Sequence, residues 1–175
     1  MAGLILLLVA PVLLVTGYPP MAMASCVETD GGFVAFTAAL RHTSDRPDGF
    51  KSIGPYGIDT TIIYDNVITN IGGAYNSATG IFTAPVKGVY FFTFTSYSWV
   101  KEKDIGVQLM KNSEEVLMVW EWQDAGDNED YASNSVVLQL KVGDGVYMRL
   151  PKTFYIAANK FHNVNTFTGY LLRQM

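Results

Sequence analysis

Residues 70–94 alternate clusters of turn-forming residues with short aromatic runs, and this alternation constrains the fold more than any other stretch of the chain. Turn clusters occupy 72–73, 76–80 and 85–88. In the run that follows, side chains alternate between the two faces of a strand, so Tyr90, Phe92 and Phe94 share one face. The opposite face holds Val89, Phe91 and Thr93. Because both faces are largely apolar, we expect a strand inside a sandwich or one covered by a neighbouring subunit.

Comparable short runs continue along most of the chain. The sequence predicts about ten short strands with turn signals between them and no stretch of helical periodicity. They are 33–40, 60–64, 67–70, 81–82, 89–94, 104–110, 116–120, 136–142, 146–150 and 166–172. The polar segments 41–57 and 152–165 are expected to be surface loops. This pattern predicts an all-β antiparallel sandwich, and by itself it leaves an immunoglobulin sandwich, a lectin-like sandwich and a jelly roll open.

Seven residues of this region stand at a spacing that resembles the signature of the globular domain of complement C1q. They are Asn70, Tyr75, Phe82, Gly88, Tyr90, Phe92 and Phe94. The chain departs from the family upstream, where Tyr64 replaces the usual Phe. The resemblance extends to 34–40, 142–148 and 166–172. It implies a ten-stranded antiparallel jelly roll like that of the tumour necrosis factor superfamily, assembled as a homotrimer around a three-fold axis.

The amino-terminal residues predict a secreted protein. An apolar run from Leu4 to Val15 is too short for a bilayer span of about 20 residues, so residues 1–24 are predicted to be a signal peptide. An uncleaved membrane anchor is the alternative. The predicted domains are therefore the signal peptide, a linker at 25–32 and a C1q-like globular domain at 33–175. No Gly-X-Y repeat occurs, so we expect no collagen stalk.

Cys26 is the only cysteine of the sequence. It lies in the predicted linker, so an intrachain disulfide is excluded, and an interchain disulfide or a free thiol remains. Cerebellin-like relatives join trimers through cysteines near the mature amino terminus. By this resemblance, Cys26 is the candidate for an interchain disulfide.

Charge is distributed unevenly along the chain, whose net charge is −4. Residues 112–140 hold seven acidic residues and no Lys or Arg, which disfavours nucleic acid as a partner. Residues 121–130 are the densest in carboxylates, and some members of the family bind calcium in this region. We therefore expect Asp124, Asp127 and Asp130 to be candidate calcium ligands. The alternative is a solvated acidic loop without the register of an EF-hand.

Catalysis is not predicted. His42 and His162 are far apart in the sequence and lack metal-site spacing, and Cys26 lies in a linker that cannot be held rigidly against a base. Among the tryptophans, Trp120 ends an apolar run and is predicted to pack in the core. For Trp122, packing beneath the acidic loop and exposure as a contact for a protein or sugar both stay open.

The resemblance therefore implies a secreted, non-enzymatic, trimeric binding module. Its partners would be its own copies and either a cell-surface protein receptor or a microbial surface glycan or lipopolysaccharide, in innate immunity or cell–cell signalling. Mixed trimers with relatives stay open. The alternatives are a cytokine of the tumour necrosis factor type and a calcium-dependent, lectin-like glycan-binding protein.

Overall fold

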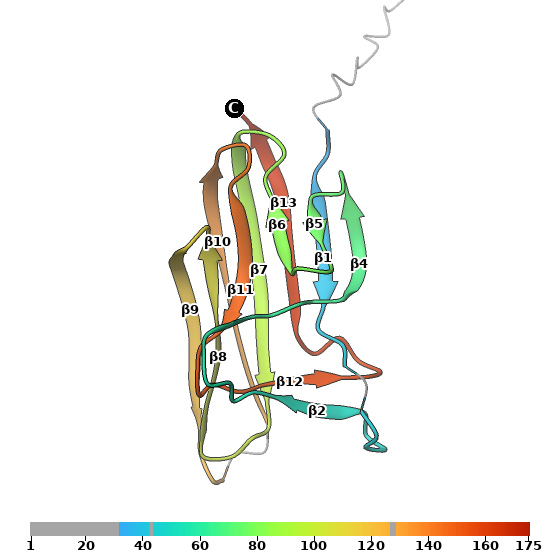
Figure 1. Cartoon of the computed structure of the whole chain (residues 1–175), viewed down its shortest axis with the longest axis vertical. Coiled ribbons are helices and arrows are strands. Elements are labelled where there is room, and N and C mark those ends of the chain that lie inside the picture. Colours follow the sequence, from blue (N-terminus) through green and yellow to red (C-terminus); the bar gives the residue numbers. More distant parts are fainter. Residues whose placement is uncertain (1–31, 43, 127–128) are drawn as a thin grey trace, which may run out of the picture.

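The computed structural model describes residues 32–42, 44–126 and 129–175, and its regular elements are antiparallel strands (Figure 1). One sheet has five strands in the order β10-β7-β13-β1-β4. Their bounds are Asp130–Leu140 for β10, Gly88–Ser98 for β7, Thr166–Gln174 for β13, Ala35–Ala39 for β1 and Asn66–Ile71 for β4. The order places strands that are far apart in sequence side by side, as a jelly roll requires.

The second sheet has six strands, with the path β5-β6-β11-β8-β9 and β3 paired to β11. Their bounds are Tyr75–Asn76 for β5, Ile81–Thr83 for β6, Gly145–Leu150 for β11, Lys103–Lys111 for β8, Glu114–Gln123 for β9 and Thr60–Thr61 for β3. A separate two-stranded sheet joins β2 (Phe50–Ile53) to β12 (Ile156–Asn159) and runs across the direction of the other strands, below β1 and β4 in Figure 1. The all-β antiparallel fold class is confirmed.

Four details of the sequence prediction need correction. The segments 41–57 and 152–165 are not loops throughout, because each contributes one strand of the β2–β12 pair. The predicted strand at 60–64 is only two residues long, and β10 begins six residues earlier than expected, at Asp130. In the described residues the strands number thirteen rather than about ten, and the extra ones are short.

Aromatic rings from both large sheets fill the space between them. Phe36 on β1 stacks on Tyr75 of β5 with ring centroids 4.7 Å apart. Phe82 of β6 meets Phe92 of β7 edge to face at 5.4 Å. Phe167 of β13 completes the cluster, at 4.9 Å from Phe36. Large rings with this geometry dominate core energetics, so this cluster is what holds the two sheets together.

The residues of the family signature lie mostly in this core. Tyr75, Phe82, Gly88, Tyr90, Phe92 and Phe94 are all buried. Gly88 allows β13 to approach β7, because a Cβ at this position would lie 2.6 Å from the carbonyl oxygen of Arg173. Asn70 is more exposed and bonds across a turn to Tyr75. The signature therefore builds the sandwich rather than a ligand site.

Candidate functional site

A row of five apolar side chains crosses the outer face of the five-stranded sheet, the face turned away from the core. The strand register places Val137 opposite Phe91, Phe91 opposite Tyr170, Tyr170 opposite Ala35, and Ala35 opposite Ile71. The rings of Phe91 and Tyr170 lie 5.2 Å apart. Val137 and Ile71, at the two ends of the row, are 56% and 48% exposed.

The neighbouring row on the same face consists of hydroxyl side chains. In strand order these are Ser135, Thr93, Thr168, Thr37 and Thr69. The hydroxyls of Thr37 and Thr168 share a hydrogen bond of 3.0 Å, and Thr93 donates to the carbonyl of Asn134 at 3.2 Å. None of the ten side chains in the two rows carries a charge. We call these ten residues the outer face.

A second exposed surface lies at the end of the sandwich opposite the carboxyl terminus (Figure 1). Here β9 is the edge strand of the six-stranded sheet, and it turns Trp120 and Trp122 outward, 60% and 49% exposed. The indole nitrogen of Trp120 donates to Oδ1 of Asp104 on β8 at 2.6 Å, which fixes the ring against the neighbouring strand. We call Trp120, Trp122 and Asp104 the tryptophan patch.

The prediction that Trp120 packs in the core is wrong. In β9 it is Val119 and Gln123 that point inward, with exposures of 7% and 0%, so the even-numbered residues between them face solvent. The run from Val116 to Trp122 is apolar at nearly every position, and a period of two cannot assign a face to such a run. Glu121 and Gln123 share the parity of the inward-facing Val119, so polar residues in this strand do not mark its outward face.

Aromatic side chains also gather beside the β2–β12 pair. Phe50, Tyr97, Trp99 and Tyr131 form a chain of ring contacts, with 4.4 Å between the centroids of Tyr97 and Tyr131. Burial raises the pKa of the Tyr97 hydroxyl, and the nearby carboxylate of Glu129 raises it further. Tyr97 therefore stays neutral over the physiological range and acts as a packing residue.

The charged residues around the tryptophan patch are mostly acidic. Five carboxylates lie on or next to the turns that join β7 to β8 and β9 to β10, in addition to Asp104 of the patch: Glu102, Glu121, Asp124, Glu129 and Asp130. Two lysines, Lys101 and Lys103, lie there too, and Lys101 donates to the carbonyl of Ala125 at 3.2 Å. The tryptophan patch is thus an apolar surface in acidic surroundings.

The predicted calcium and disulfide residues are only partly within the described chain. Asp127 and Cys26 lie outside the described residues, and so do residues 1–24. Asp124 is exposed in the β9–β10 turn, and Asp130 begins β10. Among the residues that the structure describes, three or more His, Cys, Asp or Glu side chains nowhere come close enough to hold a metal ion. The calcium site at Asp124, Asp127 and Asp130 and the disulfide at Cys26 stay predictions.

Comparison with known proteins agrees with this architecture. The family model described as "C1q domain" matches residues 35–172. The mouse and human proteins named complement C1q tumor necrosis factor-related protein 3 are both 36% identical over 141 residues, covering 79% of this chain and 51% of theirs. The chain therefore spans about half the length of these curated relatives. No helix in the described residues is long and apolar enough to cross a membrane.

Solved structures with the same fold include a complement domain, APRIL and a TNF protein. The globular domain of zebrafish complement 1qA protein superposes with a TM-score of 0.57 at 22% identity, over 82% of this chain and 99% of that one. Murine APRIL gives 0.59 at 11% identity, over 80% and 99% of the two chains. The Eiger TNF of S. frugiperda gives 0.58 at 13% identity, over 82% and 95%. These likenesses show the jelly-roll fold.

Proposed function

The chain belongs to the C1q domain family, and we propose that it acts outside the cell as a homotrimeric binding module without catalytic activity. Three copies would pack their outer faces around a common axis and present three identical tryptophan patches to a ligand. The ligand we favour is the ectodomain of a cell-surface protein.

The outer face is the observation that carries this proposal. Its two rows span all five strands, hold no charge and include Phe91, Tyr170, Val137 and Ile71. An exposed apolar surface without charge is typical of an interface between subunits, where charged residues are depleted. A three-fold ring closes through heterologous contacts, so one half of the outer face of each copy would pack against the other half of the outer face of the next copy.

The tryptophan patch supports the choice of a protein ligand. Tryptophans are enriched among the residues that dominate the binding energy of protein interfaces. The acidic residues around the patch disfavour the phosphates of lipopolysaccharide and favour a partner with basic side chains. Three weak contacts presented by one trimer raise the effective concentration at the receptor, so a deep pocket is not required.

The experiment is a binding array that holds protein ectodomains, neutral glycans and lipopolysaccharide, probed with the native protein. We expect saturable binding to an ectodomain that is lost in Trp120→Ala and kept in Phe33→Ala, which removes a similarly exposed aromatic residue just before β1. The charged variant Phe91→Lys should bind far more weakly, because it disrupts the trimer and removes avidity. Binding to lipopolysaccharide alone, unaffected by Trp120→Ala, would contradict the proposed ligand class.

A further inference from the structure

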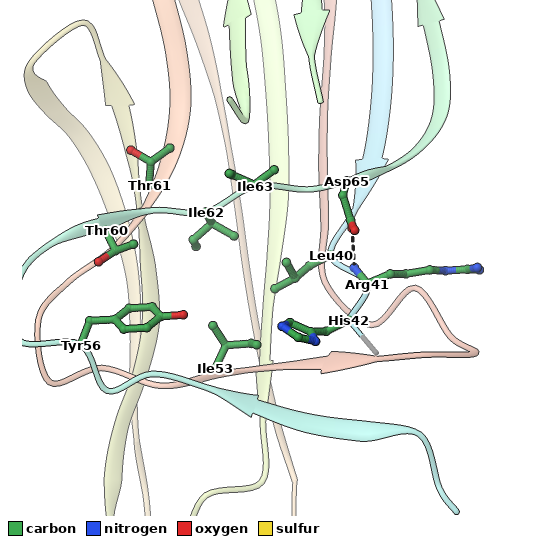
Figure 2. A pocket seen from close by; sticks show the side chains of 10 residues that line it. All are labelled: Leu40, Arg41, His42, Ile53, Tyr56, Thr60, Thr61, Ile62, Ile63 and Asp65. Atoms are coloured by element: carbon green, nitrogen blue, oxygen red, sulfur yellow. Dashed lines mark hydrogen bonds between the residues drawn. The ribbon is translucent and has the colours of Figure 1, made fainter. Parts of the chain in front are cut away.

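A cavity of about 360 Å³ lies beneath the connection between β3 and β4, on the flank of the sandwich (Figure 2). Its walls come from three segments: Leu40 and His42 directly after β1, Ile53 at the end of β2 with Tyr56 after it, and Ile62 and Ile63 in the connection itself. This volume falls within the range of small-molecule sites, about 300–1,000 Å³. The cavity is distinct from the outer face and from the tryptophan patch.

The floor of the cavity is apolar and held by the fold. Leu40 and Ile62 are 6% and 5% exposed and belong to the hydrophobic core, and Ile53 packs against that core. The amide of Leu40 donates to Asn165 at 3.0 Å, and the amide of Ile62 donates to Met148 at 2.9 Å. The first bond fixes Leu40 to the residue just before β13, and the second fixes Ile62 to β11. The floor of the cavity is therefore preformed.

Two polar groups point into the cavity from opposite ends. In Figure 2 the hydroxyl of Tyr56 and the imidazole of His42 are directed toward one another across Ile53 and Leu40. The ammonium of Lys51 on β2 lies 3.3 and 3.2 Å from the two ring nitrogens of His42. One end of the cavity is therefore basic and its middle is apolar.

Charged side chains lie next to this end of the cavity. Arg41 and Lys160 line an adjoining hollow of about 180 Å³ together with His42 and Asp65. Asp65 is the one carboxylate there, and its Oδ1 accepts the backbone amide of Arg41 at 3.1 Å (Figure 2). Arg41 and Lys160 thus outnumber Asp65 in this hollow, although Figure 2 shows the Arg41 side chain directed away from the cavity, where its Nε donates to Asn163. Lys51 lines a separate hollow with Asp45 and Arg46 and brings its ammonium against His42 from there, on a chain whose net charge is negative. This local excess of positive charge complements an anion.

We propose that this cavity binds a small amphipathic monocarboxylate, a free anion with an unbranched apolar tail. The carboxylate lies beside His42 and Lys51, where charge-assisted hydrogen bonds are stronger than neutral ones. The tail lies on Leu40, Ile53 and Ile62, and the ring of Tyr56 covers it. This site does not depend on the trimer or on the receptor proposed above.

Octanoate is the probe, titrated into the native protein and followed by calorimetry and by NMR of methyl groups. We expect saturable binding with shifts at Leu40, Ile53 and Ile62, at least about 10-fold weaker binding of 1-octanol, and weaker binding of acetate. Equal affinity for 1-octanol and octanoate, or shifts confined to another surface, would overturn the assignment. Binding to anionic vesicles without binding of free octanoate would also overturn it.

Variants test the basic end separately from the fold. Lys51→Gln should weaken octanoate binding by about 10-fold, whereas Lys141→Gln, which removes the same charge from an exposed position in another turn, should not. Ile63 is 44% exposed at the cavity wall, so Ile63→Glu and Ile63→Lys lose the same apolar surface and differ only in charge. We expect octanoate to bind Ile63→Lys at least about 10-fold more tightly than Ile63→Glu. Equal affinity of this pair, with Lys51→Gln unchanged, would refute a carboxylate site.

Discussion

The side chain of Asn70 holds Tyr75 at two points across a tight turn. Its Nδ2 donates to the carbonyl of Tyr75 at 2.8 Å, and its Oδ1 accepts the amide of Tyr75 at 3.2 Å. Between them, Gly72 and Gly73 have φ values of 81° and 63°, in the left-handed region that favours glycine. Tyr75 is fixed in this way against Phe36, and its hydroxyl donates to the carbonyl of Tyr64 at 3.0 Å.

Replacing Asn70 with Ala should destabilise the domain by about 1–3 kcal/mol, because both partners on Tyr75 lose their hydrogen bonds in a partly buried turn. Urea unfolding measures this change. Asn70→Asp keeps an acceptor for the Tyr75 amide and loses the donor, so its unfolding midpoint should fall between those of Asn70→Ala and the native protein. An Asn70→Ala midpoint equal to the native one would show that the turn does not need this bridge.

Tyr90 is fully buried between the sheets, and its hydroxyl donates to the carbonyl of Val86 at 2.8 Å. Tyr90→Ala should cost about 3–5 kcal/mol through the cavity that it leaves. Tyr90→Phe keeps the ring and loses only the hydrogen bond, at a cost of about 1 kcal/mol. Thermal and urea unfolding of both variants test this order. A loss for Tyr90→Phe as large as that for Tyr90→Ala would mean that packing is not the dominant contribution.

Gly88 is required by the close approach of two backbones rather than by a turn. A Cβ there would lie 2.6 Å from the Arg173 carbonyl oxygen, so Gly88→Ala must push β13 away from β7, and we expect a loss of about 1–3 kcal/mol. Gly57→Ala is the matched control, because a Cβ at Gly57 would meet nothing within 4 Å. Equal unfolding midpoints for the two alanine variants would contradict this account of Gly88.

Acid should weaken the contact between Arg46 and Asp48. The Arg46 side chain, which donates to the carboxylate at 3.0 and 2.6 Å, and the amide of Phe50 lower the pKa of Asp48 from 3.8 to about 2. Because the folded pKa lies below the unfolded one, this stabilisation is present above about pH 4 and is lost as the pH falls toward 2.

The measurement is the urea midpoint at about pH 5 and about pH 2.5. We expect the decrease on acidification to be smaller in Asp48→Asn than in the native protein. Asp45→Asn removes the same charge from the same loop, and its decrease should match that of the native protein. A decrease in Asp48→Asn as large as the native one would refute the contribution of Asp48.

Much of the fold could be predicted from local pattern. In the strand at 89–94 a period of two correctly groups Tyr90, Phe92 and Phe94 on one face, but it does not decide which face points inward, because the opposite face is also largely apolar. The strands β2 and β12 could not be found in this way, because their pairing joins residues about a hundred positions apart within polar segments. Their stability comes from that pairing and not from a pattern in either segment.

The candidate sites depended even more on the three-dimensional arrangement. The apolar row from Val137 to Ile71 exists only in the register of five strands that are scattered along the sequence. The cavity at His42 likewise joins residues from three separate segments, and the sequence indicated only that His42 lacked metal-site spacing. The continuous apolar run around Trp120 concealed which of its residues face solvent.

The mass of the native protein in solution, measured by light scattering without reductant, tests the central claim most directly. We expect a mass near three chains, held by the outer face at Phe91 and Tyr170, and a mass near one chain for Phe91→Lys. A mass near six chains that returns to three on reduction would add the predicted disulfide at Cys26 between two trimers. A stable monomer of the native protein would contradict the role of the outer face and the avidity that the proposed function requires.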